Sequence, residues 1–264
     1  MALPVFQNMD PRTQRMLKRI GWAGLFVAML VVYISAVERK EASLVEEVLI
    51  DIEPLPDGNS LLTDTDVRTT IQQSFGKPIE GHSIAELDIR RLESVLEEEP
   101  FILDAEAFVT AGNEVKIEIL PREPVLRVID NNGYNYYLDR NGVQMPLSEH
   151  FTAKVLVATG SLPTYEEHFL SRKRNRLKEA FLLAQLILSD PFLSALSEQI
   201  YFDSRGKITL VPKLGAGQVE FGGFEAARSK LRRIKIFYKE VLPYTGWQQY
   251  EEISVAYQNQ VVGR

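Results

Sequence analysis

The chain has 264 residues, of which 25% are charged and 45% are hydrophobic, and this balance is typical of folded protein. Its formal net charge of -6 argues against a general nucleic-acid binder, because such proteins depend on clustered cations that meet phosphates. The absence of cysteine excludes disulfides, thiol nucleophiles and thiolate metal sites, and it suits an oxidising compartment outside the cytoplasm.

Residues 20–37 form the only stretch long and apolar enough to cross a bilayer, about 27 Å as a helix. Four basic residues precede this stretch: Arg12, Arg15, Lys18 and Arg19. The positive-inside rule therefore predicts a cytoplasmic tail at 1–19 and a transmembrane helix at 20–37, with the bulk of the chain outside the cytoplasm. A cleaved signal peptide is the alternative, but the apolar run exceeds the usual core of such peptides and no Ala-x-Ala site follows it.

The next segment predicts a small α+β module. Thr63 and Asp66 fit a capping box at the start of one helix, and Ile89, Leu92 and Leu96 form the apolar stripe of a second helix, which ends at Pro100. Three strands are predicted at Leu44–Ile52, Asp104–Thr110 and Glu114–Leu120. Their order predicts a three-stranded sheet covered on one face by two helices, within a domain at 38–124.

Residues 125–264 predict a second domain with a mixed, mainly antiparallel sheet packed with helices, so the fold class is α+β. The predicted helices are Tyr165–Leu188, closed by Pro191, and Phe224–Val241. The predicted strands are Val125–Val128, Tyr134–Leu138, Val143–Met145, Lys154–Ala158, Gln199–Asp203, Lys207–Val211, Gln218–Phe221, Glu252–Tyr257 and Asn259–Val262.

No motif of catalysis is present. The three histidines, His82, His150 and His168, are too far apart to place two ligands on one helix face, and there is no nucleophile elbow or phosphate-binding loop. We therefore predict no catalytic, cofactor-binding or metal site.

Two features suggest binding to another protein. Arg172 and Arg174 belong to a basic run on the predicted long helix, which is either a solvated face or a docking site for an acidic stretch of a partner. Residues 253–262 contain neither Pro nor Lys, the residues that usually protect an exposed sheet edge. The last strand is either an open edge that accepts a partner strand or an internal strand that happens to come last.

Several short motifs occur in the order found in one bacterial family. They are Glu99-Pro100-Phe101-Ile102 after a helix, Val115-Lys-Ile-Glu-Ile119 leading to Arg122-Glu123-Pro124-Val125, the turn Asp139-Arg-Asn-Gly142, and Val219-Glu-Phe-Gly222 before the last helix. Together with the basic tail and single span, they make the chain resemble the cell-division protein family FtsQ, called DivIB in some lineages. The chain has Ala111-Gly112-Asn113 where many relatives carry a Trp-Pro pair, and it ends soon after Val262, which leaves less protein to enclose a partner.

The resemblance implies a POTRA domain followed by a β-domain, both in the periplasm of a single-pass inner-membrane protein located at the division septum. It implies a non-enzymatic scaffold of the divisome that binds FtsB- and FtsL-like division proteins and helps to control septal peptidoglycan synthesis. It also implies strand addition at the last strand, which maps to Tyr257, Gln258, Asn259, Gln260, Val261 and Val262.

Two other functions fit the same sequence. A membrane-anchored envelope enzyme would show a deep acidic cleft. A POTRA-type chaperone or secretion accessory would show repeated POTRA modules, whereas the sequence indicates one.

Overall fold

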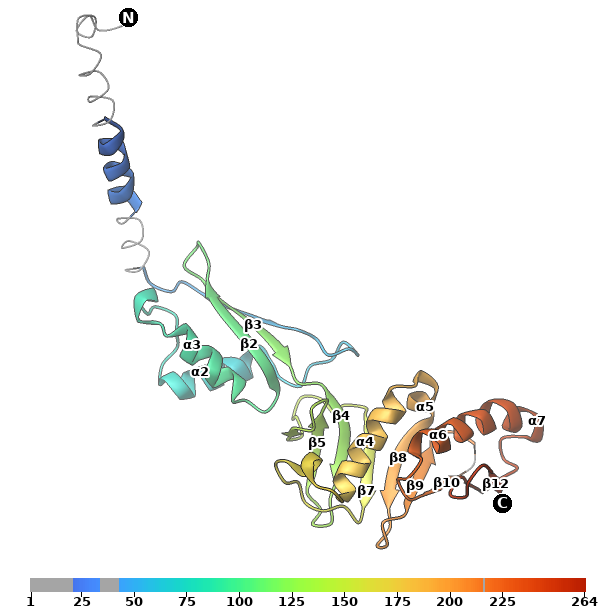
Figure 1. Ribbon diagram of the computed structural model, residues 1–264. Coiled ribbons are helices and arrows are strands. Elements are labelled where there is room, and N and C mark those ends of the chain that lie inside the picture. Colours follow the sequence, from blue (N-terminus) through green and yellow to red (C-terminus); the bar gives the residue numbers. More distant parts are fainter. Residues whose placement is uncertain (1–20, 34–42, 216) are drawn as a thin grey trace, which may run out of the picture. The chain divides into compact units, whose positions relative to one another are not determined.

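The computed structural model describes residues 21–33, 43–215 and 217–264 (Figure 1). These residues divide into two compact units. The second unit contains Ile52–Asp66, Glu97–Asp104 and Ile119–Arg264, and the first contains Val67–Leu96, Ala105–Glu118 and the described residues before Ile52.

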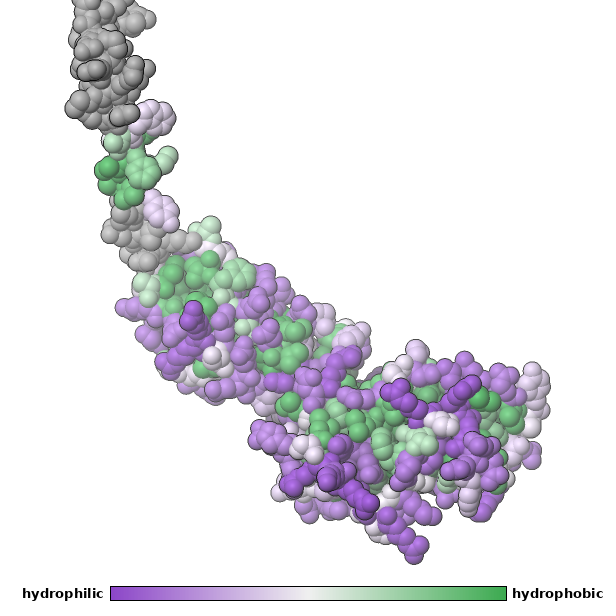
Figure 2. Space-filling model, viewed as in Figure 1, coloured by the Kyte–Doolittle hydropathy of each residue, from purple (hydrophilic) through white to green (hydrophobic). Residues whose placement is uncertain are grey.

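The amino-terminal segment is described only in part. Residues 21–33 are helical, and their side chains are mainly hydrophobic (Figure 2). The predicted tail at 1–19 lies outside the described residues, as do Ile20 and residues 34–37 of the predicted transmembrane helix. Within the described ranges, no helix has both the length and the apolar character needed to span a membrane.

The predicted three-stranded sheet is present, in the order β1-β3-β2. Its strands are β1 (Val48–Ile52), β2 (Ile102–Val109) and β3 (Val115–Pro121), and its helices are α2 (Asp64–Phe75), the short η2 (Ile84–Glu86) and α3 (Ile89–Glu97). Val115, Ile117 and Ile119 of β3 are buried, whereas Glu118 and Leu120 are exposed, which confirms a strand with one apolar face. Helices α2 and α3 lie on one side of β2 and β3 (Figure 1).

The capping box at the start of α2 is confirmed. The Thr63 N–H donates to Asp66 Oδ2 at 2.6 Å, and Thr63 Oγ1 accepts from the Asp66 N–H at 3.4 Å. These two bonds satisfy amide groups that the first helical turn leaves without partners.

The carboxy-terminal part forms a nine-stranded sheet in the order β12-β11-β10-β9-β8-β7-β4-β5-β6. Of its eight strand pairs five are antiparallel and three are parallel, which confirms a mixed, mainly antiparallel sheet. The strands are β4 (Pro124–Ile129), β5 (Asn135–Asp139), β6 (Gln144–Met145), β7 (Leu156–Gly160), β8 (Ser197–Phe202), β9 (Ile208–Pro212), β10 (Gln218–Gly222), β11 (Glu252–Ser254) and β12 (Val262–Gly263).

Helices cover one face of this sheet (Figure 1). They are η3 (Phe169–Ser171), α4 (Arg176–Leu188), α5 (Pro191–Leu196), α6 (Ala227–Ile236), the π-helical η4 (Phe237–Val241) and α7 (Leu242–Thr245). One apolar core joins the two layers and includes Leu126 and Ile200 from the strands and Phe181 and Leu231 from the helices. A smaller core contains Leu55, Leu61, Tyr137, Met145 and Ala153.

The first predicted helix of this domain was too long. It begins at Arg176 and not at Tyr165, because His168 adopts a left-handed conformation at φ 64° and Asn175 caps the helix. The Asn175 Oδ1 accepts the N–H groups of Leu177 and Lys178 at 2.8 and 3.2 Å. Pro191 does not simply end the helix, since it opens the separate helix α5.

The ends of three further predicted elements were also wrong. The last long helix begins at Ala227 and not at Phe224, since Ala226 has φ 54°. The strands predicted at Glu252–Tyr257 and Asn259–Val262 are only three and two residues long, at Glu252–Ser254 and Val262–Gly263. A turn with Asn259 at φ 57° separates them, and side-chain contacts described below fix that turn.

Candidate functional site

The candidate site is the C-terminal edge, which we define as residues 255–263. Strand β12 is the outermost strand of the nine-stranded sheet and pairs only with β11, with Ile253 opposite Gly263 and Ser254 opposite Val262. It is therefore an edge strand with one side free of other described strands.

The hydrogen-bond pattern shows which groups of β12 face outward. The Arg264 N–H donates to the Glu252 carbonyl at 2.9 Å, and the Glu252 N–H donates back to the Arg264 carbonyl at 3.4 Å. Bonded and non-bonded positions alternate in an antiparallel pair, so the N–H and C=O of Gly263 point away from β11. The same alternation directs the N–H of Val261 outward.

Arg233 on α6 holds the segment that leads into β12. One of its terminal nitrogens, Nη1, donates to the carbonyls of Tyr257 and Gln260 at 2.5 and 2.6 Å. The other, Nη2, donates to the Val255 carbonyl at 3.0 Å. One guanidinium thus fixes three points of the C-terminal edge, and these contacts account for the turn between β11 and β12.

Helix α6 is itself fixed by two other cations. Lys230, which is 6% exposed, donates from Nζ to the Gly223 carbonyl at 2.7 Å and lies over the Phe221 ring. Burial lowers the pKa of Lys230. Lys235 Nζ lies 2.5 Å from Asp190 Oδ2, and this contact lowers the pKa of Asp190.

Aromatic packing supports the inner side of β12. The Tyr250 ring lies 5.4 Å from the buried ring of Phe237, measured between centroids. A Cβ at position 263 would collide with the Tyr250 ring, so any other residue there would force this ring to move. Val261 packs partly against the main core, whereas the side chains of Tyr257 and Val262 are 57% and 39% exposed.

The predicted partner-binding residues fall into two places. Tyr257, Gln258, Asn259, Gln260 and Val261 form the connection between β11 and β12, and of the six predicted edge residues only Val262 lies in a strand. The sequence alone did not reveal that Arg233 and Tyr250 support the edge, because their contacts depend on packing between distant segments. Arg233 lies in a charged helix without any local signal that marks it.

Arg172 and Arg174 do not lie on a helix. Both are exposed in the loop before α4, and Arg172 forms an ion pair with Glu166 at 2.8 Å. Among the described residues, no hydrogen bond or ion pair joins either arginine to the C-terminal edge.

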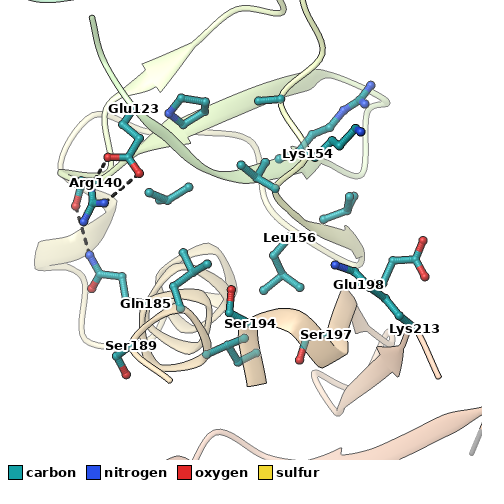
Figure 3. A pocket seen from close by; sticks show the side chains of 18 of the residues that line it. Glu123, Arg140, Lys154, Leu156, Gln185, Ser189, Ser194, Ser197, Glu198 and Lys213 are labelled. Carbon is teal, nitrogen blue, oxygen red and sulfur yellow. Dashed lines mark hydrogen bonds and ion pairs between the residues drawn. The ribbon is translucent and has the colours of Figure 1, made fainter. Parts of the chain in front are cut away.

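A cavity of about 860 Å³ lies beside the starts of β4, β7 and β8 (Figure 3). Its charged lining consists of Glu123, Glu198, Arg127, Arg140, Lys154 and Lys213. Glu123 is held by Arg140 at 2.5 and 2.8 Å, and the Arg140 carbonyl accepts from Gln185 at 3.2 Å (Figure 3). Cations outnumber carboxylates here, so this cavity is not the acidic cleft expected of an envelope enzyme.

The described part of the chain also contains no group of three His, Asp or Glu residues placed to hold a metal ion.

Comparison with protein families identifies the two parts of the chain. Residues 44–120 match the family model for a POTRA-like domain. A POTRA-like domain followed by a mixed sheet whose last strand lies at the edge defines a class of two-domain α+β proteins.

Residues 123–264 match the model described as FtsQ/DivIB, C-terminal related, which covers more than half of the chain. The chain therefore belongs to the FtsQ/DivIB family, as its motifs predicted. No curated protein matches the sequence. Domains of this family are of a non-enzymatic scaffold type, and they fit a cell-division scaffold with division proteins as partners.

Proposed function

We propose that this protein is a non-enzymatic scaffold of the divisome that binds FtsB- and FtsL-like proteins by strand addition at the C-terminal edge. Through these partners it helps to regulate septal peptidoglycan synthesis. The observation that carries the proposal is the free outer side of β12 in a member of the FtsQ/DivIB family.

We also propose that residues 20–37 anchor the chain in the inner membrane, with a cytoplasmic amino terminus and both domains in the periplasm. The basic residues before this stretch and the absence of cysteine support this placement.

The main-chain groups of the edge supply part of the binding energy. The N–H and C=O groups of Val261 and Gly263 offer up to four hydrogen bonds, each contributing about 1 kcal/mol. Their sum corresponds to an affinity of only about 1 mM. Apolar contacts must therefore add to it, and the exposed side chains of Tyr257 and Val262 are placed to make them.

The contacts of Arg233 also favour partner binding, because they reduce the conformational entropy that the edge loses on binding. Because Arg233 already fixes the carbonyls of Val255, Tyr257 and Gln260, the edge loses little conformational freedom when a partner strand arrives.

A proline at Val261 tests strand addition. Val261→Pro removes an outward N–H that makes no hydrogen bond within the described chain, and Val261→Ala is the matched control, since it shortens the side chain but keeps the N–H. We expect Val261→Pro to weaken binding of the purified FtsB-like partner at least about tenfold relative to Val261→Ala. Asn259 is unsuitable for this test, because proline cannot adopt its φ of 57°.

Equal partner affinity of Val261→Pro and Val261→Ala would refute strand addition at this edge. If Val261→Pro lowers the melting temperature, photocrosslinking replaces it as the test. A photoreactive residue at Gln260 should capture the FtsB-like partner, whereas one at the exposed Asn132 should not. Capture from Asn132 alone would contradict the proposal.

A further inference from the structure

A groove runs between the helices of the β-domain, away from the C-terminal edge. A cavity of about 880 Å³ lies between α4 and the start of α6, and a second cavity of about 490 Å³ continues along α5, α6 and η4. The two cavities share Leu186, Ser189 and Arg228, so they form one continuous groove, which we call the α4–α6 groove. From residue 228 to residue 240 it follows about 18 Å of helix.

The base of the groove is apolar. Leu182 and Leu186 contribute from α4, Leu193 from α5, and Leu231 and Ile236 from α6. Leu193 and Leu231 are only 4% exposed, but Ile236 is 47% exposed and turns its side chain toward solvent. On this face of the molecule, hydrophobic side chains lie between strongly hydrophilic ones (Figure 2).

The α6 side of the groove carries cations that no carboxylate neutralises. Lys235 is paired with Asp190, but Arg228 and Arg232 are exposed and make no hydrogen bond or ion pair with any described residue. They are four residues apart and so lie on the same helix face. Lys239, about two turns further along the helix, lies 5.0 Å over the Phe192 ring.

The carboxylates of the groove do not oppose these arginines. Asp190 is already paired with Lys235, and Glu225 and Glu240 stand at the two ends of the groove. The middle is therefore basic on one wall and apolar at the base, in a protein whose overall charge is negative.

We infer that the α4–α6 groove binds an amphipathic helix of another protein, with its apolar face on the leucines and an acidic flank against Arg228 and Arg232. Helix-in-groove binding requires apolar anchors at i, i+3 or i+4 and i+7, and the length of the groove matches about three turns. Among the described residues a second copy of this chain does not supply such a helix, because the amphipathic helices α2 and α3 already bury their apolar residues, Val67 and Ile71 in α2 and Leu92 and Leu96 in α3.

The test uses the full chain and a synthetic helix of about 14 residues, with leucines at i, i+3 and i+7 and glutamates on one flank. We expect saturable binding by fluorescence anisotropy at peptide concentrations below about 100 µM. The double variant Arg228→Glu and Arg232→Glu should weaken it on the order of tenfold. The control Lys173→Glu and Arg205→Glu makes the same charge change at exposed loop positions and should leave affinity within about twofold.

Two further measurements separate the apolar and the electrostatic contributions. Ile236→Ala should weaken binding without lowering the melting temperature, since this side chain is half exposed. A peptide with lysine in place of every glutamate should not bind. Equal loss in both double variants, or equal binding of the lysine peptide, would overturn the inference.

Other occupants would also overturn it. Self-association of the chain in sedimentation, abolished by the Arg228 and Arg232 reversal, would assign the groove to a second copy. Binding to vesicles of anionic lipid that depends on these arginines, without peptide binding, would assign it to a membrane surface.

Discussion

Removing the Arg233 side chain should loosen the C-terminal edge while leaving the rest of the domain folded. Arg233→Ala removes three hydrogen bonds, one to the carbonyl of the buried Val255 and two to the carbonyls of the exposed Tyr257 and Gln260. A charged bond to the buried residue is worth about 1.5 kcal/mol, and each exposed bond about 0.5 kcal/mol because water replaces the lost donor. The sum is about 2 to 3 kcal/mol for local opening of the edge, or about 30- to 150-fold in the opening equilibrium.

Amide hydrogen exchange measures this change directly. The Val255 N–H, bonded to the Glu220 carbonyl, and the Arg264 N–H, bonded to the Glu252 carbonyl, should exchange faster by that factor. Arg232→Ala is the control, because this neighbour on the same helix makes no hydrogen bond or ion pair among the described residues and should change exchange by less than about threefold. Equal exchange in the two variants at Val255 and Arg264 would refute the assigned role of Arg233.

Two other predictions concern the charged groups that support the domain. The Asp139 carboxylate, only 2% exposed, lies 3.0 Å from Arg122, so Asp139→Asn should lower the free energy of unfolding in urea by about 3 kcal/mol, against less than about 1 kcal/mol for Arg140→Gln at an exposed ion pair. A similar loss of unfolding free energy in Asp139→Asn and Arg140→Gln would show that burial does not determine how much an ion pair contributes to stability. The contact with Lys235 lowers the pKa of Asp190 below its usual 3.8, so its contribution is complete above pH 4 and is lost as the pH falls through the lowered value. The melting temperatures of wild type and Asp190→Asn should therefore differ at pH 7 and converge as the pH falls through this lowered pKa, and a difference that is constant with pH would contradict this.

Local patterns predicted the parts of the fold that depend on local chemistry. The alternation of Val115, Ile117 and Ile119 gave a strand with the correct buried face, and Thr63 with Asp66 marked the start of α2. The signal for α5 was also present, because Asp190 before Pro191 is a cap followed by a favoured first residue, yet Pro191 was interpreted only as a stop.

The largest remaining difference, at the C-terminal edge, arises from contacts across a long distance in the sequence. Residues 255–261 have the composition of a strand, but three carbonyls in this segment accept hydrogen bonds from Arg233, which lies more than twenty residues earlier. A turn therefore replaces the strand and its ladder of hydrogen bonds. The position predicted for Arg172 and Arg174 was wrong for a local reason: apolar periodicity extended the predicted helix across His168, whose left-handed backbone interrupts it. The open last strand could be proposed from the missing Pro and Lys, but only the strand order distinguishes an edge from an internal strand.

The strand order also makes the C-terminal edge depend on the strands that precede it in the sheet. Strand β12 can form only on β11, and β11 aligns in parallel with β10 only after α6 has crossed the sheet. A chain in which β10 and β11 have not paired therefore cannot display this ribbon, whatever the state of its other segments. Partner recruitment at this edge would report that the β-domain has folded through β10 and β11, since the ribbon pairs with no other described strand.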